Sequence, residues 1–339
     1  MSSKKEMLAQ FASHTGITRV LESLPGRGSL LILNYHRVGD PHSTPYDSAL
    51  YSCSTEEFDW QLAWLKKRFP IVNLHEALDI VHGRSKPSRT SILLTFDDGY
   101  LDNYAEAYPV LRKHNLSATF FLPTFFVGSH SLPWWDEIAF MVKLAKGERL
   151  TLTYPENEEF DLTIPDRLTT VFQVLRSFKR APVVETERFL RELETATGVK
   201  RPGEDAERCF LNWDEAREMQ AAGMCFGSHT HTHELLARLP YERQVEELRI
   251  SRQILEAELD REIDTLSYPR GRPSSFSEET FAALRETNYK TAFSFYTGVN
   301  KPGSINPLDV LREAVEEMES RSLFRLRHST YSTLGRGVV

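Results

Sequence analysis

Six short apolar runs recur along the chain, and each leads through a polar loop into a segment with helical character. The runs occupy residues 30–33, 91–96, 118–122, 224–227, 265–268 and 291–294. Strands that alternate with helices are expected to lie parallel in one sheet, with the helices outside it. Because most of these runs are largely apolar without a regular polar face, both faces of the sheet should be buried, which suits a barrel. The sequence therefore predicts an α/β fold of the barrel type.

Helical segments are expected between the strands. One should begin at Ser54, which is followed by glutamate three positions later and so has the character of a capping box. A second should run from Trp213 to Gly223. A third should follow Pro240, and we interpret this segment, which is rich in Glu and Arg, as an outer helix with a solvated face.

Changes in composition divide the chain into segments. Residues 134–209 carry Lys and Glu runs with scattered Pro, and predict a largely helical insertion within a barrel of residues 30–312. Residues 1–29 place apolar side chains at roughly helical spacing. We expect this amphipathic segment to pack on the body of the protein, with a membrane surface as the alternative. Residues 313–339 are expected to form a helical C-terminal tail.

Composition excludes several classes of protein. The 339 residues are 40% hydrophobic and 26% charged, which is typical of a folded soluble protein. The net charge of −7 argues against nucleic acid as a partner, because phosphate binding needs a basic face. Three cysteines form no C-x-x-C pair, so no zinc knuckle or disulfide framework is predicted. Neither a signal peptide nor a spanning run of about 18 apolar residues is evident, so a cytoplasmic address is expected, with peripheral contact at the inner membrane as the alternative.

Two adjacent carboxylates follow one of the apolar runs, in the segment Thr95-Phe96-Asp97-Asp98-Gly99. Charge at the end of a buried strand needs a metal or a cationic partner. The glycine allows a tight turn, so that both carboxylates can face the open end of the barrel. The alternative is a polar turn in which one aspartate caps the next helix.

Histidines follow another apolar run. His229, His231 and His233 account for three of the 11 histidines in the chain. If the chain turns helically here, His229 and His233 share one face, whereas in an extended chain all three do. Two imidazoles and one carboxylate are a usual ligand set for a catalytic zinc-like ion. The alternative is a solvated polar loop.

These segments resemble the first two motifs of the polysaccharide deacetylase family, also called the NodB homology domain or carbohydrate esterase family four. The motifs read Thr95-Phe96-Asp97-Asp98-Gly99 and His229-Thr230-x-x-His233 in this chain. Flanking segments agree with the family, namely Tyr35-His36-Arg37-Val38, Ala118-Thr119-Phe120-Phe121, and Trp213-Asp214-Glu215 with Gly223. The resemblance covers about residues 30–312 and implies a distorted (β/α) barrel with about seven parallel strands.

The resemblance also implies roles for individual residues. Asp97 matches the catalytic base of the family, and Asp98, His229 and His233 match its metal ligands. The chemistry is consistent, because a metal polarises an amide carbonyl and acidifies a water while a neighbouring carboxylate takes the proton. We expect a divalent metal, with zinc favoured over cobalt, nickel or manganese.

The third family motif is altered in this chain. It usually reads Arg-x-Pro-x-Gly, and its arginine steadies the catalytic base. Here the segment reads Ser267-Tyr268-Pro269-Arg270-Gly271, so Ser267 replaces that arginine. We expect Arg312 to supply the missing charge and to lie nearer Asp97 than Arg270 does.

The last family motif, Leu-x-His, carries the general acid. Leu326-Arg327-His328 matches it by letters, but it lies among arginines in the predicted helical tail, so we interpret it as a chance match. His36, which ends a predicted strand, is the better placed candidate for the acid or for contact with substrate.

The resemblance implies a hydrolase that removes N-acetyl groups from an N-acetylhexosamine-containing glycan or glycan precursor and releases acetate. Substrate contacts are expected from Tyr268, Pro269, Arg270, Arg312 and Trp135, although Trp135 would alternatively pin the insertion to the barrel. Two other functions stay open. One is an amidohydrolase acting on a formamide or a cyclic amide, and the other is an inactive barrel that only binds glycans. The sequence leaves the oligomeric state undetermined.

Overall fold

The computed structural model describes residues 4–24, 26–180, 185–203, 207–315 and 319–335. The chain forms two compact units. Unit 1 comprises Met1–Gly39, Ser52–Val127 and Phe210–Val339, and unit 2 comprises Asp40–Tyr51 and Gly128–Cys209. The short strands β2 (Arg37–Val38) and β3 (Tyr51–Cys53) flank the first excursion of the chain into unit 2.

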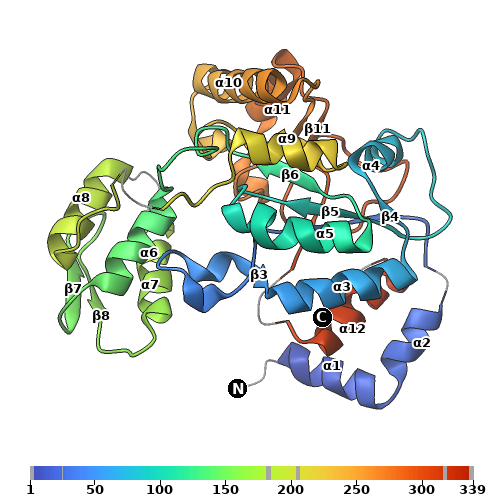
Figure 1. Cartoon of the computed structure of the whole chain (residues 1–339), viewed down its shortest axis with the longest axis horizontal. Helices are drawn as coiled ribbons and strands as arrows, with labels where there is room; N and C mark the ends of the chain where they lie inside the picture. Colours follow the sequence, from blue (N-terminus) through green and yellow to red (C-terminus); the bar gives the residue numbers. More distant parts are fainter. Residues whose placement is uncertain (1–3, 25, 181–184, 204–206, 316–318, 336–339) are drawn as a thin grey trace. The chain divides into compact units, whose positions relative to one another are not determined.

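In the described part of the chain, unit 1 is built on one sheet of eight strands, and all the recorded pairings within it are parallel (Figure 1). Seven follow the path β11-β10-β9-β6-β5-β1-β12, and β4 pairs with β5 off this path. Their bounds are β1 (Leu30–Tyr35), β4 (Ile71–Val72), β5 (Ser91–Phe96), β6 (Thr119–Leu122), β9 (Cys225–Ser228), β10 (Thr265–Ser267), β11 (Thr291–Phe293) and β12 (Glu313–Ala314). The predicted distorted barrel of about seven parallel strands is confirmed.

The strands form where the sequence is apolar on both faces. All six residues of β1 and all six of β5 are buried, as expected for a sheet covered on both sides. A bridge between Phe293 and Val310 joins β11 to the segment before β12, so the two ends of the strand path approach each other. The strand β12 lies beyond residue 312, where the sequence suggested that the barrel ends. It contains Glu313, which gave no apolar signal.

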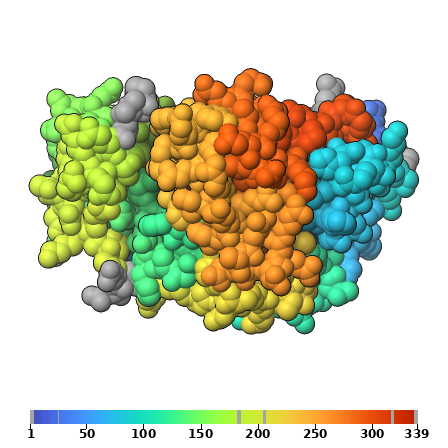
Figure 2. Space-filling view, turned by 90° about the horizontal axis from the view of Figure 1, so that it is seen from above, coloured from blue at the N-terminus to red at the C-terminus, as the bar shows by residue number. Residues whose placement is uncertain are grey.

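Helices surround this sheet, and α10 and α11 lie on the outer surface of unit 1 (orange in Figure 2). Asn212 caps α9 in a full capping box with Glu215, and Ser54 accepts a hydrogen bond from the Glu57 amide at the start of α3. None of the described helices has the length and hydropathy that crossing a bilayer requires. The helices of unit 1 are α1 (Lys4–His14), α2 (Ile17–Ser23), α3 (Thr55–Arg68), α4 (Leu74–Val81), α5 (Tyr108–His114), α9 (Trp213–Ala221), α10 (Tyr241–Leu259), α11 (Glu278–Glu286) and α12 (Arg321–Leu334).

The N-terminal helices α1 and α2 pack against α12 (Figure 1). Small side chains make this contact, because Ala9 and Ala12 are buried with Leu323 and Leu326 of α12. The large apolar side chains of α1 and α2 are mostly exposed. The expected packing of this segment on the body of the protein is thus seen for α1 and α2, but small side chains make the contact and most of the apolar side chains stay exposed.

Unit 2 has a hydrophobic core of its own. It contains α6 (Trp134–Leu144), α7 (Arg167–Arg180) and α8 (Thr186–Thr197), together with an antiparallel hairpin of β7 (Arg149–Leu152) and β8 (Glu158–Asp161). The sequence suggested a largely helical segment from residue 134 and did not reveal the hairpin, which is short and has one charged face.

His328 lies inside α12, fully buried with its ring against Phe324. Its Nδ1 is 2.7 Å from the Phe324 carbonyl oxygen, and burial lowers its pKa to about 3. A buried ring is closed to substrate, so the interpretation of Leu326-Arg327-His328 as a chance match agrees with the structure.

The buried His328 predicts acid sensitivity. Its folded pKa lies below the unfolded value of about 6.5, so the unfolded chain gains the proton first and stability falls as pH falls below that value. Between pH 8 and pH 5 this histidine should remove about 2 kcal/mol from the free energy of unfolding. Denaturant unfolding of wild type and of His328→Gln at both pH values measures the difference. Equal pH dependence of the two proteins would contradict the account.

Candidate active site

The candidate site lies at the carboxyl ends of β5 and β9. Asp97 and Asp98 follow β5, and His229 follows β9. The chain turns sharply at both places, because Asp98 has a φ of 72° and Thr230 and His233 have φ values of 65° and 62°. Residues other than glycine rarely adopt this left-handed region, and such strain gathers at functional sites.

Asp98, His229 and His233 form a compact cluster. Asp98 Oδ1 lies 3.4 Å from His229 Nε2 and 3.3 Å from His233 Nε2, and one ligand atom from each residue lies within 4.8 Å of the others. Asp98 Oδ1 is buried and makes no hydrogen bond to the described residues. A buried carboxylate oxygen between two imidazole nitrogens fits a divalent cation that prefers nitrogen and oxygen ligands.

Burial and neighbouring charges shift the pKa values of all three residues of the cluster. Burial alone would raise the pKa of Asp98, but His229 and His233 beside it lower that pKa well below its usual value. Burial would lower the pKa of His229, but Asp97 and Asp98 raise it. Burial lowers the pKa of His233. The two imidazoles thus differ, and the carboxylate between them stays ionised.

Hydrogen bonds outside the cluster fix its geometry. His229 Nδ1 lies 2.7 Å from the Ser267 carbonyl oxygen, so Nδ1 carries the proton and Nε2 offers its lone pair to the site. Glu247 of α10 accepts hydrogen bonds from the amides of His231 and Thr232 at 3.0 and 2.8 Å. Sequence reasoning missed Glu247 because the Glu/Arg-rich helix read as solvated, yet this residue is buried.

Asp97 makes a buried two-pronged ion pair with Arg312. The guanidinium nitrogens lie 2.8 Å from Asp97 Oδ1 and 2.7 Å from Oδ2. Ser267 also donates to Asp97 Oδ2, at 3.2 Å, and accepts from Arg312 at 2.7 Å. The expected contact between Arg312 and Asp97 is confirmed. Among the described residues, no ion pair or hydrogen bond joins Arg270 to Asp97.

Burial would raise the pKa of Asp97, but Arg312 and then His229 hold it below its usual value, with a smaller effect of His36. Asn34, inside β1, donates to Asp97 Oδ2 at 3.2 Å and accepts from Arg312 and Thr95. Arg312 Nε donates to the Ser294 carbonyl at 2.9 Å. Sequence reasoning missed Asn34 and Ser294, and the available signal was a polar residue at the end of each apolar run.

A family model described as polysaccharide deacetylase matches residues 84–148 and 160–292, which is more than half of the chain. This chain belongs to the polysaccharide deacetylase family. The residues matched by the family model include the two aspartates, both histidines of the cluster and the altered third motif.

Individual relatives match this chain over only part of their length. A putative polysaccharide deacetylase, YxkH of Bacillus subtilis, is 36% identical over 94 residues, covering 27% of this chain and 31% of YxkH. The poly-beta-1,6-N-acetyl-D-glucosamine N-deacetylase of Staphylococcus aureus is 33% identical over 121 residues, covering 33% of this chain and 41% of the relative. The matches thus span less than half the length of these curated relatives.

Solved structures of deacetylases share the fold. IcaB from Ammonifex degensii superposes with a TM-score of 0.57 and 21% identity, covering 91% of this chain and 98% of IcaB. The Streptococcus pyogenes deacetylase PplD, in complex with acetate, superposes with a TM-score of 0.56 and 18% identity, covering 88% of this chain and 96% of PplD.

Two of the residues predicted to contact substrate have buried side chains with other partners. Tyr268 is buried, its hydroxyl donates to the Leu308 carbonyl at 2.8 Å, and its ring stacks on Phe276. Trp135 is buried in the core of unit 2. Both side chains serve packing, so neither is open to the predicted contact with substrate. Arg312 is likewise fully buried, and its guanidinium is bonded to Asp97, Asn34 and Ser294.

Of the other residues predicted to contact substrate, His36 and Arg270 have accessible side chains and remain candidates, whereas Pro269 does not. His36 is half-buried at the end of β1, and its ring centroid lies 5.4 Å from that of Phe295 in an edge-on arrangement. Pro269 is buried and Arg270 is exposed, both in the turn after β10. Arg270 has a φ of 60°, so this turn is strained like those that carry the metal-ligand candidates.

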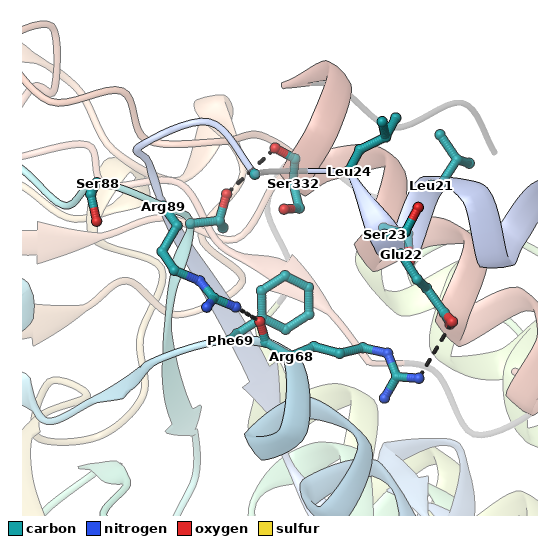
Figure 3. A pocket seen from close by; sticks show the side chains of 12 residues that line it. Leu21, Glu22, Ser23, Leu24, Arg68, Phe69, Ser88, Arg89 and Ser332 are labelled. Atoms are coloured by element: carbon teal, nitrogen blue, oxygen red, sulfur yellow. Dashed lines mark hydrogen bonds and ion pairs between the residues drawn. The ribbon is translucent and has the colours of Figure 1, made fainter.

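A cavity of about 420 Å³ lies at the opposite edge of the sheet (Figure 3). It is lined by Gly26 and Thr90, which precede β1 and β5, and by residues of α2 and α12. Arg68 in its wall pairs with Glu22, and Arg89 donates to the Arg68 carbonyl. The cavity contains none of the residues predicted for catalysis.

Proposed function

We propose that this chain is a metal-dependent hydrolase that removes N-acetyl groups from N-acetylhexosamine residues of a glycan or glycan precursor and releases acetate. The observation that carries the proposal is the Asp98, His229 and His233 cluster with the Arg312-bound Asp97 directly beside Asp98 in sequence. The Staphylococcus aureus relative is named for poly-beta-1,6-N-acetyl-D-glucosamine, which supports this substrate class.

In this proposal Asp98, His229 and His233 hold a divalent cation, zinc in the first place. When bound, such a cation polarises the amide carbonyl and acidifies water. The hydrogen bond from His229 to Ser267 and the ionised state of Asp98 prepare these ligands. Burial lowers the pKa of His233, which favours its neutral form, whereas Asp97 and Asp98 raise the pKa of His229, so a bound cation would displace a proton held there.

Asp97 acts as the general base in this proposal. Its lowered pKa keeps it ionised at neutral pH, and Arg312 and Ser267 fix its orientation. The attacking water gives a proton to Asp97 as its oxygen bonds to the acetyl carbon. The C–N bond then breaks, and the amine leaves as it gains a proton.

We propose His36 as the donor of that second proton. It lies at the carboxyl end of β1, which is the edge that carries Asp97 on the neighbouring β5. The Asn103 side chain donates to the backbone carbonyl of His36 at 2.7 Å, and the backbone amide of His36 donates to the Ser52 hydroxyl at 3.0 Å. The backbone of His36 is thus held on both sides. A half-buried imidazole at this edge is able to donate a proton as a general acid.

Acetate release from short β-1,6-linked N-acetylglucosamine oligomers tests the proposal. We expect turnover that a chelator abolishes and that added zinc, cobalt, nickel or manganese restores. A formamide and a cyclic amide should react at least about tenfold more slowly, which is a modest discrimination for a positioned substrate. Faster reaction of either amide would favour the amidohydrolase alternative. Glycan binding without turnover, in a protein shown to contain metal, would favour the inactive glycan-binding barrel.

A further inference from the structure

The helices α1 and α2 carry an exposed apolar surface. Of the ten large hydrophobic side chains exposed among the described residues, six belong to this short segment. Met7 is 62% exposed, and Phe11 and Val20 are each 60% exposed. We call this surface the N-terminal apolar face, and it consists of Met7, Leu8, Phe11, Ile17, Val20 and Leu24.

The two helices bury their small side chains and expose their large apolar ones, which is the reverse of an ordinary surface helix. Ala9, Ala12 and Thr18 are buried, while the larger apolar side chains point outward. A globular protein normally turns its large apolar residues inward, and contiguous exposed apolar surface marks an interaction site. The helices therefore bury their small residues on α12 and leave their large ones for another partner.

The acidic and basic residues of this segment also differ in their surroundings. Glu6 accepts from the amide and hydroxyl of Ser320, and Glu22 accepts from Arg325 at 2.8 Å, so both acids are engaged by α12 and its cap. The basic residues Lys4, Lys5 and Arg19 are exposed. The outer surface is thus apolar and basic in a chain whose net charge is −7.

We propose that the N-terminal apolar face docks on the surface of a lipid bilayer that contains anionic lipids. Amphipathic helices with apolar and basic residues lie in the plane of the interface, where apolar burial and attraction to anionic headgroups add. The helices have 11 and 7 residues, which suits lying on a bilayer and not crossing it. This proposal is independent of the deacetylase activity.

A second copy of the chain is the main competing occupant. A symmetric dimer through this face would bring the basic residues Lys4, Lys5 and Arg19 of both copies into one interface, because an isologous interface pairs the same patch of each copy. Like charges brought together in this way are unfavourable, whereas an anionic bilayer offers compensating charge. Charge therefore favours the bilayer.

Cosedimentation of the full chain with vesicles tests the proposal. We expect binding to phosphatidylcholine vesicles that contain phosphatidylglycerol, weaker binding to phosphatidylcholine alone, and loss of binding at high salt. The double variant Phe11→Ser/Val20→Ser should bind at least about tenfold more weakly, and so should Lys5→Glu/Arg19→Glu. Phe172→Ser is the matched control, because Phe172 of α7 is 62% exposed but lies in unit 2, and it should bind like wild type.

Circular dichroism and thermal unfolding should show all three variants folded like wild type, since the replaced side chains are exposed. Absence of wild-type binding to anionic vesicles would overturn the proposal, as would equal loss of binding in Phe172→Ser. A wild-type dimer in light scattering that dissociates in Phe11→Ser/Val20→Ser would also overturn it, and would assign the face to a second copy.

Discussion

Replacing Asp97 with asparagine is expected to lower the rate of acetate release by about 10²–10⁴-fold, the usual range for losing a general base. The amide keeps the shape of the carboxylate but cannot accept the proton of the attacking water. It also leaves the buried guanidinium of Arg312 without its counter-charge. The measurement is turnover at saturating substrate, together with metal content and unfolding temperature of the variant.

A matched control separates catalysis from packing in this variant. Ser267→Ala removes one hydrogen bond to Asp97 and one to Arg312 but leaves the carboxylate in place. It should lower turnover by less than about 30-fold, because each of the two hydrogen bonds contributes about 1 kcal/mol. If Ser267→Ala loses as much activity as Asp97→Asn, the carboxylate is not the base.

Replacing Arg312 with methionine is expected to lower the free energy of unfolding by about 3–5 kcal/mol, because it leaves a buried carboxylate without its partner. Arg312 is fully buried, and its guanidinium bonds to Asp97, Asn34 and Ser294. Denaturant unfolding of the variant measures this loss. Arg270→Met is the control, because Arg270 is exposed and should change stability by less than about 0.5 kcal/mol.

The same variant has a second readout. Without the Arg312 charge, burial raises the pKa of Asp97, so the ionised base should appear only at higher pH. The acidic limb of the pH–rate profile should therefore move upward in Arg312→Met and stay in place in Arg270→Met. An unchanged limb together with full stability would show that the ion pair does not support the base.

The sheet was predictable because its strands carry an uninterrupted physical signal. All six residues of β5 are buried and four of them are apolar, so composition alone marks this strand. The strand β12 lacks such a signal, since Glu313 and Ala314 pair with β1 through their backbone and Glu313 accepts a hydrogen bond from Tyr331. Two-residue strands of this kind depend on neighbours that are distant in sequence.

The cluster of Asp98, His229 and His233 was predictable for a related reason. Parallel strands end at one edge, so polar residues that follow apolar runs meet there even when the runs are far apart in sequence. Arg312 was predictable as the partner of Asp97, because it follows Val310 and Leu311 and a buried carboxylate needs a cation.

The supporting residues were harder to find. Glu247 lies on the buried face of α10 with Gln244 and Ser251, three polar residues at helical spacing among apolar ones. That spacing was a visible signal, but a Glu/Arg-rich helix more often exposes its acids. Trp135 shows the opposite error, since an aromatic residue in an insertion packs inward when the insertion has its own core.

The most direct test of the central claim is the initial rate of acetate release by Asp98→Asn and Asp97→Asn across a titration with divalent metal. A neutral amide oxygen is a poorer ligand than a carboxylate, so Asp98→Asn should bind metal weakly and recover activity in part as metal is added. Asp97→Asn should retain metal near one ion per chain and stay inactive at every concentration. Rescue of Asp97→Asn by metal without rescue of Asp98→Asn would contradict the assignment of the two carboxylates.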